Sequence, residues 1–208
     1  MTATLALDYA SVLVFALTGA LVASRAQLDL IGFFFIACLT AVGGGTLRDL
    51  LLDRDPVFWL ADPVPLGLAC AAAVVVFFGA HLLESRYAVI RWLDAAALSV
   101  AVAAGVSVAR EMEQSAAIVL VMGVVTGTFG GLMRDVVCNE VPLVLKQGEL
   151  YVTAAAAGAG AALIAAAVTD HALAPILACI IATFALRAGS LAFGWSLPVY
   201  KPHPPRTK

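Results

Sequence analysis

The chain has 208 residues, of which 62% are hydrophobic and only 12% are charged. A soluble domain is nearer half apolar and a quarter charged, so this composition excludes an ordinary soluble domain. The formal net charge of −2 gives no electrostatic reason to expect a nucleic acid as partner.

Runs of about 20 apolar residues, long enough to cross the hydrocarbon core of a bilayer, recur along the whole chain. We predict an all-α, polytopic membrane protein with seven transmembrane helices, at roughly 9–24, 29–51, 65–83, 92–109, 115–137, 150–168 and 172–193. Together they form a single membrane domain over residues 1–208, and none has the pattern of a removable signal peptide.

Positive charge outside the spans gathers on one side of the membrane. With seven spans, the odd-numbered loops and the C-terminus share a side, which holds Arg25, Arg86, Arg91, Lys146, Lys201, Arg206 and Lys208. The other side holds Arg54 and Arg110. Because positive charge marks the cytoplasm, we predict an N-terminus outside and a cytoplasmic C-terminus in a short basic tail at 198–208.

One segment of the chain occurs twice. TAVGGGTLRDLLLDRDP (Thr40–Pro56) is similar to TGTFGGLMRDVVCNEVP (Thr126–Pro142) at a constant offset of 86 residues, which also pairs Asp8 with Asp94. We therefore predict two three-helix repeats, at about 8–85 and 92–169, with a seventh helix at about 172–193 outside them. Each repeat has an odd number of spans, so the second enters the membrane from the opposite side. Inverted repeats of this kind are common in proteins that carry solutes.

Glycines cluster at equivalent places in the second and fifth spans. They are Gly43, Gly44 and Gly45 in the second, and Gly127, Gly130 and Gly131 in the fifth. Three glycines in a row weaken a helix by roughly 3 kcal/mol relative to alanine. One interpretation is close helix packing, for which glycines are usually spaced rather than contiguous. We favour the other, a break or kink that exposes backbone polar groups along a permeation path.

An arginine-aspartate pair follows the glycines in each repeat, as Arg48-Asp49 and Arg134-Asp135. Charged residues within spans are expected to face a bundle interior or a watery cavity. Counted from mid-span, each arginine lies about 12 Å toward its own face of the membrane. We predict one pair at each mouth of a central path, with the hydroxyls of Thr40, Thr126 and Thr128 between them. The alternative is that each pair only neutralises itself and holds the helices in place.

Two further acids, Asp8 and Asp94, stand near the start of the first and fourth spans. A carboxylate at a helix N-terminus is stabilised by the helix dipole. Either this capping role or attraction of cations explains them.

The doubled GG-x-x-RD motif, in GGGTLRD and GTFGGLMRD, lies within two three-span repeats followed by a seventh span. In this it resembles the prokaryotic branch of the trimeric intracellular cation channels, long catalogued as a duplicated "glycine transporter" domain. The resemblance implies a homotrimer with one pore in each protomer, between second and fifth helices kinked at the glycines, which conducts monovalent cations, chiefly potassium. It also implies that Arg48, Asp49, Arg134 and Asp135 form a polar girdle.

We therefore expect a potassium-permeable channel in the bacterial inner membrane, with membrane lipid as a partner and bound lipid as a further ligand. The four cysteines and three histidines lack metal-ligand spacing, so neither a metal site nor a cofactor is expected. No nucleophile–base constellation indicates an enzyme. The alternative is a secondary carrier for a small solute such as glycine, because inverted repeats serve carriers equally well.

Overall fold

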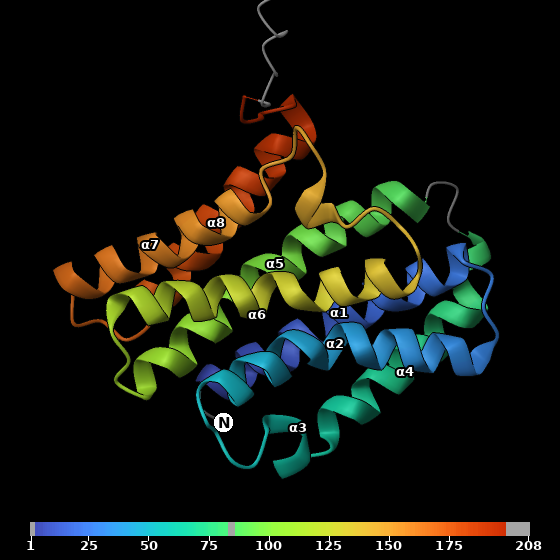
Figure 1. The fold of residues 1–208 in the computed structure, drawn as a ribbon, viewed down its shortest axis with the longest axis horizontal. Coiled ribbons are helices and arrows are strands. Elements are labelled where there is room, and N and C mark those ends of the chain that lie inside the picture. Colours follow the sequence, from blue (N-terminus) through green and yellow to red (C-terminus); the bar gives the residue numbers. More distant parts are fainter. Residues whose placement is uncertain (1–2, 83–85, 199–208) are drawn as a thin grey trace, which may run out of the picture.

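The computed structural model describes residues 3–82 and 86–198 (Figure 1). Its long helices are α1 (Ala3–Arg25), α2 (Leu30–Leu51), α4 (Val64–Gly79), α5 (Arg86–Glu111), α6 (Ala116–Val137), α7 (Val152–Val168) and α8 (Ala174–Phe193). The one-turn helix α3 (Phe58–Ala61) and the 3-10 turns η1 (Ala80–Leu82) and η2 (Leu143–Leu145) lie in the connections. The predicted basic tail falls outside the described residues from position 199 onward.

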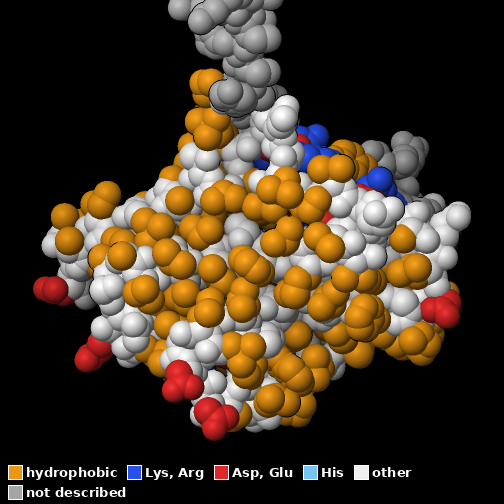
Figure 2. All heavy atoms as spheres, in the orientation of Figure 1, with side chains coloured by type: hydrophobic (Ala, Val, Ile, Leu, Met, Phe, Trp, Pro, Cys, Tyr) orange, Lys and Arg blue, Asp and Glu red, His pale blue; other side chains and the backbone are white. Residues whose placement is uncertain are grey.

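Each predicted span corresponds to one long helix, which confirms the all-helical membrane fold. Six of the described helices are long and apolar enough to cross a membrane, and α7, with 17 residues, is a shorter apolar helix. An unbroken helix satisfies every interior backbone N–H and C=O within itself, as hydrocarbon requires. Figure 2 shows hydrophobic side chains across the middle of the face in view. Most acidic side chains in this view lie along its lower left margin, and the basic ones lie toward the upper right.

The helices pack as two similar halves and one addition. In the first half α1 packs against α2 and α4, and in the second half α5 packs against α6 and α7. The halves meet where α1 contacts α5 and where α2 contacts α6. The helix α8 has no counterpart in the first half and packs against α7 and α5, on the flank opposite α4 (Figure 1).

The backbone repeats at the same offset as the sequence. Left-handed φ angles occur at Gln27 (54°) and Asp53 (53°) in the first half, and at Glu113 (54°) and Asn139 (54°) in the second. Each pair of equivalent residues turns the chain after the corresponding helix. The helices α2 and α6 also end alike, since the N–H groups of Leu52 and Cys138 donate to Arg48 and Arg134 carbonyls, both at 3.0 Å.

The crossing of α2 and α6 shows that the halves are inverted. Gly44 of α2 lies against Thr126 of α6, whereas Thr40, one turn earlier in α2, lies against Gly130, one turn later in α6. Contacts that run in opposite directions along two helices require the helices to be antiparallel. Equivalent helices therefore run in opposite directions, as two odd-numbered repeats require.

Candidate functional site

The glycines form the contact surface between α2 and α6. A Cβ atom added to Gly44 would lie 2.1 Å from the Thr126 carbonyl oxygen, and one added to Gly130 would lie 2.4 Å from the Thr40 carbonyl oxygen. Such distances are far below van der Waals contact, so only glycine allows the two backbones to approach this closely. The pair is symmetric, because each glycine faces the threonine that the other helix carries at the equivalent position.

The two helices are not interrupted at these glycines, and a kink within them stays a prediction. Both α2 and α6 continue as α-helices through Gly43–Gly45 and Gly127–Gly131. Apolar surroundings offer displaced backbone groups few other partners, and close packing compensates the weak helix propensity of glycine. The remaining glycines of the set also lie against neighbours: a Cβ on Gly43 would meet Met133, one on Gly45 would meet Phe58, and one on Gly127 would meet Val102.

The three predicted threonines all bond to their own helices. The hydroxyls of Thr40, Thr126 and Thr128 donate to the carbonyls four residues earlier, at 2.6, 2.7 and 2.8 Å. Gly19 of α1 packs closely against Thr40, and the equivalent Gly105 of α5 packs closely against Thr126. These hydroxyls therefore contribute to packing at the crossing as well as polarity.

Arg48 lies at the centre of a buried charged cluster. Its guanidinium donates to Asp49 through Nε at 2.7 Å and to Asp8 through Nη1 at 2.8 Å. The second oxygen of Asp49 accepts the backbone N–H of Phe58 at 2.8 Å, which fixes the chain after α2. The Arg48 side chain is fully buried, and that of Asp8 is 8% exposed.

Arg134 forms the equivalent cluster in the second half. It donates to Asp135 through Nε at 2.8 Å and to Asp94 through Nη1 at 3.1 Å. Asp135 in turn accepts the N–H of Leu143 at 2.9 Å. Arg134 also donates to the Thr18 hydroxyl of α1 at 3.0 Å, so this cluster joins the two halves.

The two clusters lie apart along the molecule. Arg48 contacts α1 at Asp8 and Arg134 contacts it at Thr18, ten residues or about 15 Å further along the helix. We call the two ends the Asp8 mouth and the Asp94 mouth. In each cluster one buried arginine faces two aspartates, and at the Asp8 mouth the partly exposed Arg54 also lies 3.6 Å from Asp49.

Two cavities lead inward from the Asp8 mouth. The wider, of about 220 Å³, is lined by charged and aromatic groups that include Asp8, Tyr9, Asp62 and Glu111. Tyr9 donates its hydroxyl to Asp62, and this bond lowers the pKa of the Asp62 carboxyl below its ordinary value. The narrower cavity, of about 10 Å³, lies between α1, α2, α5 and α6 and borders Gly44 and Thr126. Phe58 lines both.

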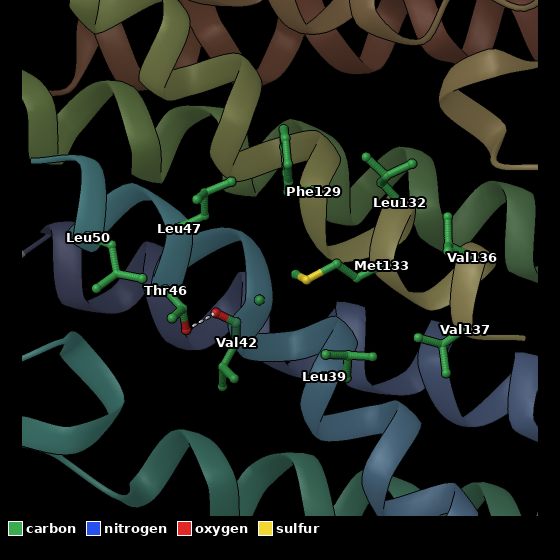
Figure 3. A pocket seen from close by; sticks show the side chains of 11 residues that line it. Leu39, Val42, Thr46, Leu47, Leu50, Phe129, Leu132, Met133, Val136 and Val137 are labelled. Carbon is green, nitrogen blue, oxygen red and sulfur yellow. Dashed lines mark hydrogen bonds between the residues drawn. The ribbon is translucent and has the colours of Figure 1, made fainter.

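A larger groove between α2 and α6 has a different character (Figure 3). It has a volume of about 560 Å³ and is lined almost entirely by apolar side chains such as Leu47, Phe129 and Met133. Its one hydroxyl, that of Thr46, donates to the Val42 carbonyl of its own helix at 2.7 Å. Ions would find no charged group here. The charged and hydroxyl side chains that line cavities therefore lie on the α1 and α5 side of the crossing, away from this groove.

At each mouth an arginine of the first half and a glutamate of the second half occupy equivalent positions. At the Asp94 mouth, Arg25 and Glu140 form an ion pair at 3.3 Å. At the Asp8 mouth, Arg54 and Glu111 both line the wider cavity. At the 86-residue offset Arg25 corresponds to Glu111 and Arg54 to Glu140, so the first half supplies the cation at both mouths.

A third buried arginine, Arg187 of α8, has no counterpart in the first half. It pairs with Glu149 at 2.6 Å, and its guanidinium lies 4.9 Å from the centre of the Tyr151 ring. Glu149 also pairs with Arg91 at 3.1 Å. Sequence reasoning did not identify Glu149 or Tyr151, because neither belongs to the repeated motif.

The pairing of Arg48 with Asp8 and of Arg134 with Asp94 was also missed. Both aspartates were expected to cap helices or attract cations, and the structure shows them as counter-ions of the motif arginines. The sequence did contain a signal. The aspartate precedes its arginine by 40 residues in both halves.

Known proteins share this sequence pattern and fold. A family model described as "Glycine transporter" matches the chain twice, over residues 5–81 and 91–167. The UPF0126 inner membrane protein YadS of Escherichia coli (strain K12) is 38% identical over 156 residues, which cover 73% of each chain. A UPF0126 membrane protein of Vibrio cholerae is 35% identical over 199 residues, which cover 93% of this chain and 81% of that protein.

Among solved structures, the TRIC trimeric intracellular cation channel orthologue from Rhodobacter sphaeroides superposes with a TM-score of 0.90. It is 41% identical and covers 93% of this chain and 100% of its own. The doubled glycine-arginine-aspartate motif, the inverted halves and the seventh helix all agree with these matches. The chain therefore belongs to the Glycine transporter family and has the fold of the trimeric intracellular cation channels.

Proposed function

We propose that this protein is a monovalent cation channel, chiefly for potassium, with one ion path inside each protomer. The path enters at the Asp8 mouth, passes the crossing of Gly44 and Gly130 between α1, α2, α5 and α6, and leaves at the Asp94 mouth. The observation that carries the proposal is the pair of buried clusters, each with one arginine and two aspartates, at the two ends of this route.

The second carboxylate beside each buried arginine favours cations over anions, although Arg54 partly offsets it at the Asp8 mouth. Within a low-dielectric protein interior a fixed charge acts over several ångströms with little screening. Asp62 and Glu111 add negative charge at the wider cavity. Charged residues at membrane depth typically mark an ion or substrate path. The similarity to a protein described as a cation channel supports the same function.

The setting follows from the relatives and the surface. We propose a homotrimer in the bacterial inner membrane, with the N-terminus outside and the C-terminus in the cytoplasm. Basic residues at the Asp94 mouth, among them Arg25, Arg91 and Lys146, support its placement at the cytoplasmic face. Lipid tails fill the apolar groove of Figure 3 wherever no neighbouring protomer covers it.

A pair of single-cysteine variants tests the orientation in a background without the native cysteines. Asp170 and Gln147 are both exposed, in connections at opposite ends of the molecule. We expect a membrane-impermeant maleimide added to intact cells to label Asp170→Cys and to leave Gln147→Cys unlabelled. The reverse pattern would overturn the orientation.

A carrier is the second candidate, and one observation favours it. The Asp8 side chain reaches a cavity, whereas the equivalent Asp94 side chain is 0% exposed, so the path is open at one end and closed at the other. A carrier in one of its two access states has this form.

One experiment separates the two candidates. Purified protein in a planar bilayer under a potassium gradient should give discrete, cation-selective current steps. In a parallel measurement, uptake of labelled glycine into liposomes that contain the protein is assayed. Saturable glycine uptake without current steps would reject the channel and favour the carrier.

A further inference from the structure

The two mouths are built from equivalent segments of the two halves but differ in the side chain at one equivalent position. At the Asp8 mouth, Pro65 lines the wider cavity beside Asp8. At the 86-residue offset, the residue equivalent to Pro65 is Tyr151. A compact imino acid in one half is thus replaced by a large aromatic side chain in the other.

Tyr151 lies in the position that closes the Asp94 mouth. Its side chain is buried, with 2% exposure. A Cβ added to Gly131 would lie 3.2 Å from the Tyr151 hydroxyl and 3.5 Å from Asp94, so the hydroxyl and the carboxylate flank the same glycine. Asp94 is 0% exposed beneath this arrangement. The tyrosine hydroxyl and the Asp94 carboxylate are therefore buried next to each other over Gly131.

Tyr151 and the residues before it are in contact with α8, which has no equivalent in the first half. Arg187 lies against the tyrosine ring and pairs with Glu149. The backbone N–H of Leu150 donates to the Ser190 hydroxyl at 3.0 Å. The ring itself and the two residues that precede it, Glu149 and Leu150, thus all contact α8, and this attachment exists at the Asp94 mouth.

The Tyr151 hydroxyl is buried close to the Asp94 carboxylate. Among the described residues it has no hydrogen-bond partner of ordinary geometry, although it is buried. Unsatisfied buried hydroxyls are costly, so this position is less stable than a fully bonded one. The preceding connection includes Gly148 in a left-handed conformation, with φ of 83° and open space around it.

We propose that Tyr151 is the gate of the Asp94 mouth and that α8 holds it closed through Arg187, Glu149 and Ser190. In the closed state the ring covers Gly131 and Asp94. Movement of the ring away from Gly131 connects the cluster of Arg134, Asp94 and Asp135 to solvent. This proposal rests on the ion path described above and assigns its gating residue, and it gives the unpaired seventh helix a role.

The test uses cysteine accessibility, which does not require ion flow. In a cysteine-free background, Ala97→Cys reports on the Asp94 half and Ser11→Cys, its equivalent, on the Asp8 half, where Ser11 lines the narrow cavity. Because a minor open state is populated at about 10% or less, Tyr151→Ala should raise the modification rate at position 97 about tenfold or more. The rate at position 11 should stay unchanged, and Tyr151→Phe, which keeps the ring, should behave as the parent.

Two outcomes overturn the gate. One is an unchanged rate at position 97 in a Tyr151→Ala protein that melts normally. If Tyr151→Ala fails to fold, Pro65→Tyr carries the test: it should slow modification at position 11, and an unchanged rate would reject the gate. Faster labelling at position 97 without potassium current in any variant would support the gate and reject the channel, so the two proposals can fail separately.

Discussion

Gly44 and Gly130 hold reciprocal positions, each against the backbone carbonyl of a threonine on the other helix. The added Cβ atoms would lie 2.1 Å and 2.4 Å from the carbonyl oxygens of Thr126 and Thr40. Because backbone cannot rotate away as a side chain can, a single methyl group forces the two helices apart. The crossing is therefore the least tolerant contact between the halves.

Alanine at either position should destabilise the protein. Overpacking of this kind costs about 1–3 kcal/mol, and it outweighs the gain of about 1 kcal/mol in helix propensity. Gly44→Ala and Gly130→Ala should both melt below the parent in detergent. Gly160→Ala is the matched control, since nothing lies within 4 Å of its added Cβ, and it should melt at or above the parent temperature. A Gly44→Ala protein as stable as Gly160→Ala would contradict the close contact.

Removal of the arginine should cost more than removal of an aspartate in the same cluster. Arg134→Gln leaves Asp94 and Asp135 buried without their cation, which typically costs 3–5 kcal/mol. Asp94→Asn leaves one arginine and one aspartate, a balanced pair, so its effect on the free energy of unfolding should be smaller. Thermal or denaturant melts of the two variants give the order. Equal melting points would show that the charge balance of the cluster is not what stabilises it.

Two glutamates should respond very differently to the same substitution. Glu149→Gln leaves Arg187 buried and unpaired, with an expected loss of about 3–5 kcal/mol. Glu140→Gln breaks a pair with Arg25 in which both side chains are about a third exposed, so a loss of about 0–1 kcal/mol is expected. Unfolding of both variants under identical conditions measures the contrast. A mild Glu149→Gln phenotype would mean that Arg187 finds another counter-charge.

The carboxylate of Asp8 should raise the conductance for cations. It lines both cavities of the Asp8 mouth, so Asp8→Asn should lower single-channel potassium conductance. The reduction should be larger at about 0.01 M salt than at about 1 M salt. The Debye length, the distance over which a charge still acts, is about 30 Å at the lower concentration and about 3 Å at the higher one. Asp170→Asn, in an exposed connection, should change little. Salt-independent loss of current in Asp8→Asn would indicate a structural role instead.

Hydropathy was sufficient to predict the helices, because a bilayer accepts few other backbone conformations. The repeat predicted the equivalence of α2 and α6, and the odd number of spans predicted their opposite directions. The close packing of the glycines was not favoured from the sequence, because a partner helix, not the sequence of one helix, decides whether a glycine packs. The contacts of Gly44 depend on Thr126, which lies 82 residues away in the chain.

The charged clusters were foreseen only in part. Arg48 and Arg134 were recognised as buried groups in need of partners, but their partners on α1 and α5 depend on how the halves fold back. Tyr151 gave no signal of its own, since an aromatic residue near a span end is ordinary. The difference between the two mouths becomes visible only when Tyr151 is compared with Pro65, at the equivalent position of the other half.

The arginine and glutamate at each mouth make the two halves complementary and no longer interchangeable. Two copies of the first half, paired in the same inverted manner, would place Arg25 of one copy against Arg54 of the other. Two copies of the second half would place Glu111 against Glu140. Only a mixed pair sets opposite charges together at both ends, as in the 3.3 Å contact of Arg25 with Glu140. If the chain were split between α4 and α5, each fragment would select the other over itself.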